Sequence, residues 1–293
     1  MYFVTKTFSI LRCKSQLAIN KMNSVKFNDY SAFKDILNKS KNIIVLTGAG
    51  VSAESGIPIF RGSGGLWRKY KATSLATPEA FHANPGLVWE FYHYRRTVAF
   101  AASPNKAHLA LARYEAECKK LGKQFTIITQ NVDGLHHKAG AENVIELHGS
   151  LRKVRCTSCK KVEVNLDNPI CEILKNRGDP SADEKNLPPI AKDELPKCKE
   201  CGKLLRPHIV WFGENLEGHV LSQAQNLVES CDLCLIVGTS SIVYPAAAFG
   251  QIVAERGQPV AEFNLNEEPA QDMFNFHFSG PCGTTLPIAL GYE

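Results

Sequence analysis

Three features of the sequence predict an α/β fold, with a doubly wound parallel sheet and a small inserted second domain. Short apolar, β-branched runs recur, and each ends in glycine or polar residues, as buried parallel strands do. One run leads directly into the glycine-rich stretch GAGVSAESG at 48–56. Two Cys-x-x-Cys pairs then interrupt the alternation of strands and helices. We therefore expect a metal-binding module inside a nucleotide-binding fold.

The bulk composition limits the class of protein. The chain has 293 residues, enough for one large domain and a smaller one. No apolar run approaches the ~20 residues that a membrane-spanning helix needs, so we expect no membrane insertion. The chain has 10 cysteines and no secretory signal, which favours a reducing compartment, one metal site and several buried thiols.

The excess positive charge lies at the N-terminus. Residues 1–28 contain no acidic residue, and their five basic residues equal the formal net charge of +5. The rest of the chain is near neutral, which argues against a nucleic-acid partner. A basic, hydroxyl-bearing segment broken by apolar residues is typical of a mitochondrial targeting sequence, with a disordered basic tail as the alternative. We expect the mitochondrial matrix as the location, with the cytosol as a second one.

The expected elements follow in chain order. A helix at 29–40 precedes a buried strand at 42–47, and the glycine turn and a short helix follow it. The aromatic-rich stretch 57–110 predicts a helical cap. Further strands are expected at 125–129, 144–148, 233–237 and 260–264. The expected domains are 29–150 and 205–293 for the two parts of the nucleotide-binding domain, with 151–204 as the insertion.

The paired cysteines Cys156, Cys159, Cys198 and Cys201 predict one structural Zn²⁺ ion. Four thiolates on two tight turns close a tetrahedral coordination sphere and leave no position for catalysis. Two disulfides or coincidental pairing are the alternatives. Cys231 and Cys234 have the same spacing, but they open an expected strand, so we interpret them as buried core.

The stretch Gly48-Ala49-Gly50-Val51-Ser52-Ala53 fits a dinucleotide phosphate turn, because it follows a strand and opens a helix. A plain glycine turn is the alternative. No acidic residue follows at the ~20-residue distance that holds an adenosine ribose in dehydrogenases, which argues against an oxidoreductase. Asn264, at the end of a later strand, could hold that ribose instead.

Polar residues at other strand ends are candidates for the reaction itself. Because ligands of parallel sheets bind beyond the carboxyl ends of strands, these loops should line one site. Gln130 and Asn131 offer amides that can bind a ribose or an amide ring. His148 follows another strand and is a candidate general base, although His136 and His137 compete with it and a structural histidine is the alternative.

Five runs together resemble the sirtuins, the NAD-dependent protein-lysine deacylases. They are GAGVSAESGIPIFRG (48–62), TQNVDGLHHKAG (129–140), ELHG (146–149), PHIVWFGE (207–214) and GTSSIVYPAA (238–247). They occur in the family's order around the four-cysteine insertion, and the resemblance covers about 30–290. Within the family, the sequence is most similar to the mitochondrial sirtuin-5-type desuccinylases and demalonylases.

The resemblance implies a Rossmann-like domain, a small zinc-binding and helical domain, and NAD between them. NAD would be consumed, giving nicotinamide and 2′-O-acyl-ADP-ribose. The implied catalytic residues are His148, as general base, and Asn131. The implied NAD-binding residues are Gly48, Ala49, Gly50, Ser52, Phe60, Arg61, Trp67, Gln130, Asn131, Val132, Asp133, Gly238, Thr239, Ser240, Asn264, Leu265, Asn266 and Cys282. The implied peptide-binding segment, which would add a substrate strand, comprises Val210, Trp211, Phe212, Gly213 and Glu214.

The acyl class has its own signature. Tyr92 and Arg95 share one face of an expected helix, and a phenol beside a guanidinium suits a carboxylate. In acidic-acyl sirtuins this Y-x-x-R pair binds succinyl, malonyl or glutaryl groups, and Ala72 matches the small residue that widens their pocket. The alternative is an Arg95–Glu90 pair on a solvated face, and we interpret Arg96 as a solvated neighbour.

The expected partners are therefore acylated-lysine proteins or peptides, bound by a monomer. The other activities that remain open are weak deacetylation, mono-ADP-ribosyl transfer or lipoamide removal, and a non-catalytic NAD-sensing or acyl-lysine-binding module. A long neutral acyl chain would leave the guanidinium unpaired, and a pure binding module would not need a base at His148.

Overall fold

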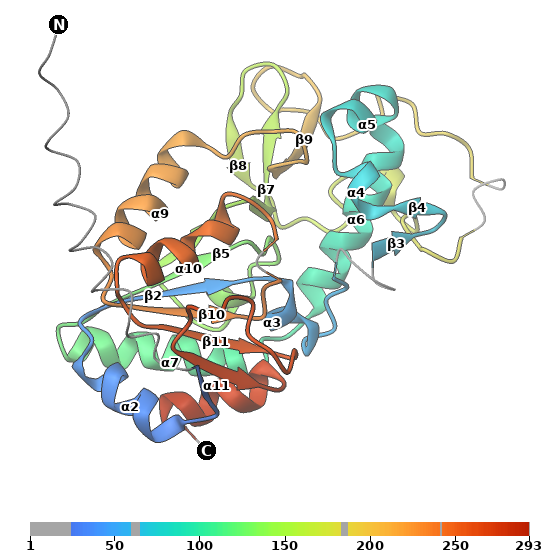
Figure 1. The fold of residues 1–293 in the computed structure, drawn as a ribbon. Coiled ribbons are helices and arrows are strands. Elements are labelled where there is room, and N and C mark those ends of the chain that lie inside the picture. The colour runs from blue at the N-terminus through green and yellow to red at the C-terminus, as the bar shows by residue number, and fades with distance from the viewer. Residues whose placement is uncertain (1–24, 60–64, 183–186, 241, 293) are drawn as a thin grey trace, which may run out of the picture.

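The computed structural model describes residues 25–59, 65–182, 187–240 and 242–292. Its main feature is a parallel sheet of seven strands (Figure 1). From one edge to the other the strands are β1 (Lys26–Phe27), β12 (Phe276–Ser279), β11 (Val260–Asn264), β10 (Leu233–Val237), β2 (Asn42–Thr47), β5 (Gln124–Thr129) and β6 (Val144–Glu146). The predicted doubly wound fold is confirmed. The expected strand at 144–148 stops at Glu146, so His148 lies beyond its end.

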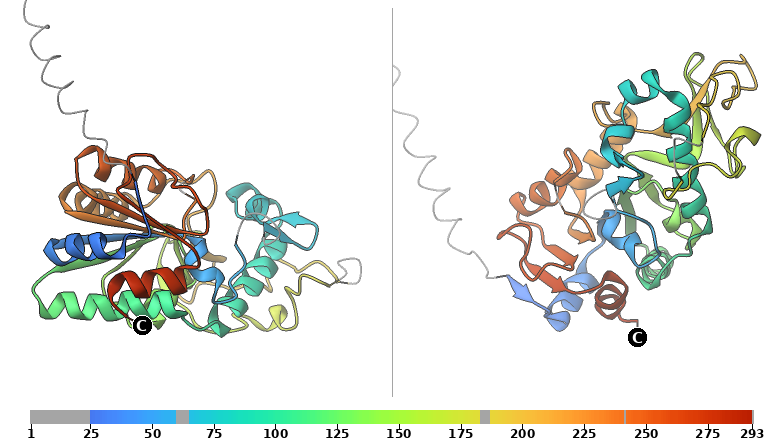
Figure 2. Two further views of the ribbon diagram at one scale, coloured as in Figure 1. Left: turned by 60° about the horizontal axis from the view of Figure 1, so that its bottom comes forward. Right: turned by 90° about the vertical axis from the view of Figure 1, so that its right-hand side faces the viewer.

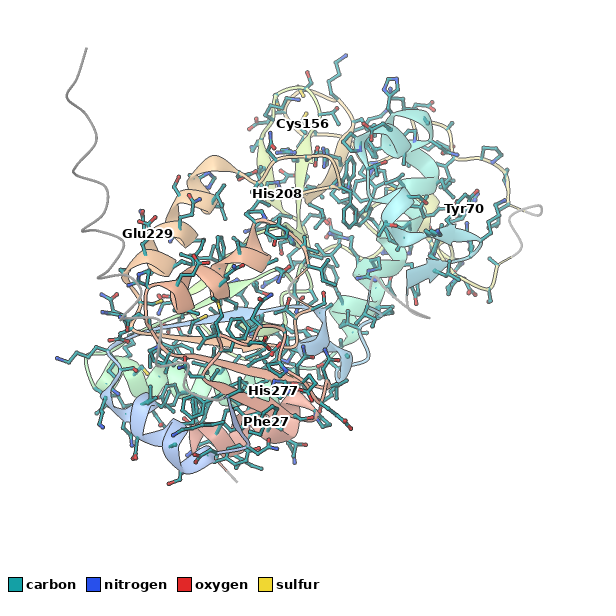
Figure 3. All side chains as sticks on the ribbon, viewed as in Figure 1. Phe27, Tyr70, Cys156, His208, Glu229 and His277 are labelled. Carbon is teal, nitrogen blue, oxygen red and sulfur yellow. The ribbon has the colours of Figure 1, made fainter. Side chains whose placement is uncertain are left out.

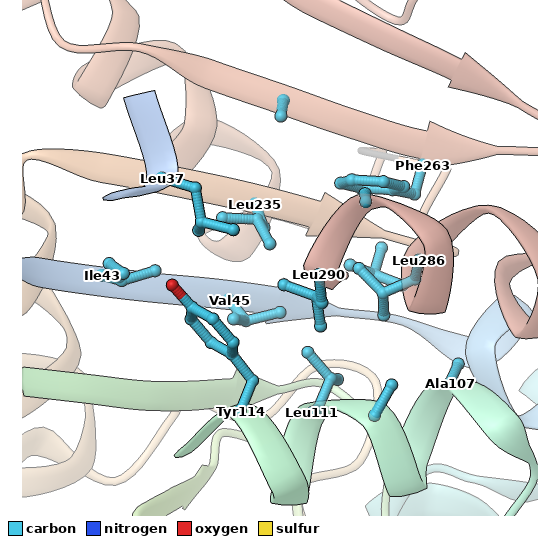
Figure 4. Packing of buried hydrophobic residues seen from close by; sticks show 14 of the residues in the cluster. Leu37, Ile43, Val45, Ala107, Leu111, Tyr114, Leu235, Phe263, Leu286 and Leu290 are labelled. Atoms are coloured by element: carbon cyan, nitrogen blue, oxygen red, sulfur yellow. The ribbon is translucent and has the colours of Figure 1, made fainter. Parts of the chain in front are cut away.

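Helices cover both faces of the sheet (Figure 2). On one side lie α2 (Tyr30–Lys39), α7 (Lys106–Lys120) and α11 (Cys282–Leu290), and on the other lie α9 (Gly218–Ser230) and α10 (Ala246–Glu255). Strand residues alternate between these layers: Ile43 and Val45 of β2 pack with the first core, and Ile44 and Leu46 with the second. Figure 4 shows the first core, where Leu111, Leu286 and Leu290 of the helices meet β2 and β10.

The small domain combines helices with a second sheet. Strands β7 (Gly149–Cys156), β8 (Val162–Val164) and β9 (Leu205–Ile209) form this antiparallel sheet in the order β8-β7-β9. Against it pack α4 (Ala72–Leu75), α5 (Pro78–Ala83) and α6 (Pro85–Ala101), with the hairpin of β3 (Leu66–Trp67) and β4 (Tyr70–Lys71) beside them. The described residues also form the short helices α3 (Ala49–Ala53) and α8 (Leu135–Lys138) and the 3₁₀ turn η2 (Glu172–Leu174).

Several expected boundaries differ from those of the structure. The cap expected at 57–110 includes a β-hairpin, and its last residues begin α7, which packs on the main sheet. β9 belongs to the small sheet, although 205 was the expected return to the large domain. The expected targeting segment 1–28 lies mostly outside the described residues, but its end forms β1, which pairs with β12. Within the described residues, no helix combines the length and apolar character needed to cross a bilayer.

Candidate active site

Loops after four neighbouring strands meet at the carboxyl edge of the sheet, and side-chain hydrogen bonds join them. The Asn131 side-chain amide donates to the Gly48 carbonyl at 2.9 Å, which joins the ends of β5 and β2. The Gln130 amide donates to the Thr239 hydroxyl at 3.0 Å, and the Asn264 amide donates to the Thr239 carbonyl at 3.0 Å. The structure thus brings the predicted residues of these four loops together on one surface.

Gly48 and Gly50 are needed for the close packing of this edge. A Cβ on Gly50 would lie 2.7 Å from the Gly238 carbonyl oxygen, and one on Gly48 would lie 2.6 Å from Thr239 Cβ. The Gly50 amide also donates to the Gly238 carbonyl at 2.7 Å. These glycines therefore let the turn after β2 contact the turn after β10, a role that the phosphate-turn prediction did not include.

His148 is fixed in one tautomer by its backbone neighbour. Its Nδ1 lies 3.0 Å from the Gln130 carbonyl oxygen, which can only accept, so Nδ1 carries the proton and Nε2 has a free lone pair. Burial lowers the pKa of His148 below its ordinary value, although the bond to Gln130 acts in the opposite direction. The ring is therefore neutral near pH 7, with Nε2 available to accept a proton.

The residue after His148 has to be glycine. Gly149 has a φ of +79°, and a Cβ there would lie 2.1 Å from the His208 carbonyl oxygen of β9. The His148 carbonyl in turn accepts the Val210 amide at 2.9 Å. Both contacts tie the candidate base to the small sheet, so the position of His148 depends on both domains.

Asp133, Ser52 and Asn131 form a buried polar group beside the turn after β2. The Ser52 hydroxyl donates to Asp133 Oδ2 at 2.8 Å, and the Asn131 amide donates to Ser52 Oγ at 3.1 Å. Burial raises the pKa of Asp133, while the Leu135 amide, Ser52 and nearby Arg95 oppose that rise. This group is an internal support as well as a candidate contact for a bound ribose.

The sequence interpretation missed two residues that support this group. Asn105 caps α7, and its side chain also donates to the Val51 carbonyl at 2.7 Å. His108 Nε2 lies 3.4 Å from Ser52 Oγ, and burial lowers the pKa of His108 to about 4, so this histidine is neutral. An asparagine cap with histidine at the third helical position is a sequence signal for α7, but not for its contact with α3.

The two competing histidines have other partners. His136 Nε2 lies 3.0 Å from the buried Thr47 hydroxyl, and burial keeps the pKa of His136 well below its ordinary value. His137 is partly exposed and lies 3.9 Å from Glu146. Neither stands at the strand end occupied by His148, which leaves His148 as the candidate general base.

Tyr92 and Arg95 are buried on one face of α6. Their exposed fractions are 1% and 7%. The Tyr92 hydroxyl accepts the Trp211 indole N–H at 2.8 Å, and Arg95 Nη1 donates to the Pro58 carbonyl at 2.9 Å. Ala72, the first residue of α4, is buried in the same apolar cluster as Tyr92 and Trp211. The guanidinium and phenol therefore lie inside the small domain rather than in solvent.

The alternative ion pair of Arg95 with Glu90 is wrong. Glu90 pairs with Arg68 at 2.7 Å and with Arg177 at 3.0 Å, and all three side chains are largely buried. Both pairs tie α6 to other segments of the small domain, the hairpin at Arg68 and the loop at Arg177. The Glu90 carboxylate thus has two guanidinium partners, neither of which is Arg95.

The interpretation of Arg96 as solvated is also wrong. Arg96 is 1% exposed, and its guanidinium donates to the carbonyls of Leu151, Asn165 and Asp167. Those carbonyls belong to β7 and to the loop after β8. Arg96 follows Arg95 directly, so its side chain points to a different face of α6. Sequence spacing could not show that β7 and the loop after β8 cover that face.

We expect Glu90→Gln to destabilise the protein strongly. It would leave two buried guanidinium groups without their carboxylate, and breaking a buried pair costs about 3–5 kcal/mol. Urea unfolding of the zinc-loaded protein measures this cost. The matched control is Glu117→Gln, because Glu117 pairs with Arg113 at 3.4 Å on an exposed helix face, where a pair is worth below about 1 kcal/mol. Equal midpoint shifts for the two variants would contradict the prediction.

The predicted peptide-binding segment 210–214 has internal partners for much of its backbone. The Trp211 amide donates to Glu214 at 2.8 Å, and the Phe212 amide donates to the Ala76 carbonyl at 2.9 Å. Glu214 also forms a two-bond pair with Arg206, at 2.6 and 2.8 Å. A substrate strand pairing here would therefore use the carbonyl groups and Gly213, while Glu214 maintains the turn.

The remaining predicted NAD contacts differ in accessibility. Leu265, Asn266 and Ser240 are exposed, whereas Trp67 is buried and donates to the Gly178 carbonyl at 2.9 Å. The Cys282 thiol is buried and points at the Phe263 carbonyl, and burial raises its pKa to about 12, which excludes a thiolate role near pH 7. Val132 is half-buried. Phe60 and Arg61 lie outside the described residues.

The four predicted zinc ligands converge at the tip of the small sheet, where Figure 3 labels Cys156. All their sulfur atoms lie within 4.8 Å of one another, with Cys156 3.4 Å from Cys201 and Cys159 3.8 Å from Cys198. Thiolates at ~2.3 Å from a tetrahedral Zn²⁺ would be about 3.8 Å apart, so the set fits the ion and excludes disulfides. Cys231 and Cys234 are buried core, as predicted.

We expect Cys198→Ser to lose most of the zinc and to lower the melting temperature, because a structural site contributes directly to folding. Elemental analysis of zinc per chain and thermal unfolding measure the two effects. Cys231→Ser is the matched control: it breaks a pair with the same spacing, and we expect one zinc ion per chain to remain. Full zinc content in Cys198→Ser would contradict the four-cysteine assignment.

Comparison with known proteins decides the family. A model described as the Sir2 family matches residues 48–245, more than half of the chain. The chain is a member of the Sir2 family. A relative from Daphnia pulex, named NAD-dependent protein deacylase, is 57% identical over 265 residues, covering 90% of this chain and 96% of the relative. The mitochondrial NAD-dependent protein deacylase sirtuin-5 of Canis lupus familiaris is 55% identical over 88% of this chain and 84% of its own.

Solved structures agree with this membership. A crystal structure of a Sir2 homologue in complex with NAD has a TM-score of 0.76 and 42% sequence identity, covering 92% of this Sir2 chain and 94% of the homologue. The Rossmann-like sheet, the zinc-binding and helical domain and the family expected from the sequence are therefore confirmed.

Proposed function

We propose that this Sir2 protein is a mitochondrial NAD-dependent protein-lysine deacylase that removes succinyl, malonyl and glutaryl groups. The relatives named as NAD-dependent protein deacylases support the activity, and those named mitochondrial support the location. The observation that carries the acyl class is the burial of Arg95 beside Tyr92 on α6. A buried guanidinium favours an anionic ligand, and a carboxylate matches its fork of donors.

The strand-end residues would hold NAD. Amide and hydroxyl groups of Gln130, Asn131, Thr239 and Asn264 offer both donors and acceptors there, a set that suits ribose hydroxyls and a carboxamide. When bound, NAD would supply the ribosyl carbon that accepts the acyl oxygen. The surrounding buried side chains would limit access of water to that reaction.

His148 would act as the general base. Its neutral ring directs Nε2 away from the Gln130 carbonyl, and a neutral imidazole can take a proton from a ribose hydroxyl near pH 7. Asn131, held between Gly48 and Ser52, would position the ribose end of the cofactor. The acylated lysine of a protein substrate would enter along 210–214. A monomeric state and the lack of a nucleic-acid partner remain predictions.

A panel of acyl-lysine peptides assayed with NAD tests this function. We expect nicotinamide release with succinyl-, malonyl- and glutaryl-lysine peptides, much less with the acetyl-lysine peptide, and almost none without peptide. The physical reason is that the acetyl group offers no carboxylate to the buried guanidinium. Equal turnover of acetyl-lysine would contradict the acyl class, and peptide-independent NAD hydrolysis would contradict a deacylase.

A further inference from the structure

Glu262 and His277 form a fully buried pair behind the strand-end surface. Glu262 lies on β11 and His277 on β12, directly opposite each other in the sheet register. Their exposed fractions are 1% and 0%, and His277 Nδ1 lies 3.2 Å from Glu262 Oε2. Neither residue belongs to the candidate site above. Ionisable side chains are rarely buried so completely unless they are paired, so this pair needs an explanation.

The pair contacts the first part of the loop that follows β11 at two points. His277 Nε2 lies 2.8 Å from the Asn266 carbonyl oxygen, and the Ala270 amide donates to Glu262 Oε2 at 2.8 Å. Residues 265–268, around the first of these contacts, are exposed. A loop with few buried apolar contacts depends on such hydrogen bonds for a single conformation.

The hydrogen-bond partners define the protonation of the pair. The Asn266 carbonyl can only accept, so Nε2 carries a proton. Nδ1 faces a carboxylate oxygen that already accepts the Ala270 amide, so another proton lies between Nδ1 and Oε2. Both ring nitrogens of His277 thus have a partner within the protein, as buried polar groups require.

Neighbouring strands connect the pair to the site and shield it. The Asn264 amide, which donates to the Thr239 carbonyl, also lies 3.5 Å from Glu262 Oε1. On the other side, Phe27 of β1 is in register with His277, and their rings meet edge to face at 5.7 Å. Figure 3 shows Phe27 and His277 close together at this edge of the sheet.

We propose that Glu262 and His277 are positioning residues for the adenosine end of NAD, acting through the loop 264–270. This inference rests on the proposed use of NAD. The pair touches neither the acyl site nor His148, so its loss affects cofactor affinity and leaves the chemical step intact. Asn264 stays in hydrogen-bond contact with Thr239 only while Glu262 and the loop behind it keep their places.

His277→Phe and Glu262→Gln test the role. His277→Phe removes both polar contacts and keeps a ring against Phe27, and Glu262→Gln keeps the shape but removes the charge. In each, we expect the KM for NAD to rise about tenfold or more, with kcat at saturating NAD within about threefold and an unchanged KM for the acyl peptide. His277→Gln, which can still donate to Asn266, should recover part of the loss.

Calorimetric binding of ADP-ribose supplies a readout that needs no deacylation. We expect the affinity of both variants for ADP-ribose to fall by the same factor as the KM for NAD rises. The matched control is His219→Phe, because His219 is largely exposed and lies on α9, not on β11, β12 or the loop between them. The proposal would be overturned if a variant that folds had a lowered melting temperature but an unchanged KM for NAD and an unchanged affinity for ADP-ribose. If the wild-type protein lacked deacylase activity but still bound ADP-ribose, the proposed function would be refuted, whereas the positioning role of Glu262 and His277 would still stand.

Discussion

Deacylation is expected to fall by about 10³-fold when His148 is replaced by asparagine, because a positioned general base contributes roughly 10²–10⁴ in rate. Asparagine removes the imidazole Nε2 but offers an amide that can still donate to the Gln130 carbonyl, which now accepts the His148 Nδ1 proton at 3.0 Å. Single-turnover kinetics with a succinyl-lysine peptide and NAD measure the chemical step. Binding of ADP-ribose should change little, since the strand-end amides remain.

The dependence on pH separates a base from a structural histidine. The pKa of His148 is lowered by burial, so the active neutral form persists below pH 6.5 and is lost only as pH falls through that lowered pKa. The acid limb of kcat/KM should therefore lie below about pH 6.5, and His148→Asn should lack it. The control is His137→Gln, whose partly exposed ring lies 3.9 Å from Glu146 and should be replaceable. Near-normal activity in His148→Asn would remove it as the base.

Much of the fold could be predicted because its strands are buried on both faces. The expected strands at 42–47, 233–237 and 260–264 coincide with β2, β10 and β11. Apolar residues form an unbroken run through most of β2 and all of β10, while β11 is apolar except for Glu262 and Asn264. β12 was missed, since Phe276-His277-Phe278-Ser279 alternates apolar and polar residues although both faces are covered. The alternation arises because His277 has a buried partner, Glu262, which is distant in sequence.

The candidate site, too, could be predicted only in part from the sequence. Loops after strands were predicted to meet because parallel strands end at one edge. The hydrogen bonds from Gln130 and Asn264 to Thr239, and from Asn131 to Gly48, confirm this. Helical spacing placed Tyr92 and Arg95 on one face, but it could not tell that Arg96 would be covered by the loop after β8. Nor could it assign Glu90, because Arg68 and Arg177 approach from segments distant in sequence.

Arg95→Met should change the choice of acyl group more than any other single substitution in the small domain. Arg95 is 7% exposed, and removing one partner of a charge-assisted pair with an acyl carboxylate in such a place costs about 2–5 kcal/mol. We therefore expect kcat/KM for succinyl-lysine to fall by about 10²-fold, since each 1.4 kcal/mol is a factor of ten. For acetyl-lysine, which offers no carboxylate, the change should stay within about threefold.

The ratio of the two substrates distinguishes recognition from support of the fold. Arg95 also donates to the Pro58 carbonyl at 2.9 Å, so its loss could loosen the segment before the hairpin and affect every substrate alike. A parallel fall for succinyl- and acetyl-lysine would show that structural role and refute the acyl assignment. Arg95→Lys keeps the charge but loses the fork of donors, so it should recover only part of the succinyl activity. Arg113→Met, on the exposed face of α7, is the matched control, and it should leave the ratio of succinyl to acetyl activity unchanged.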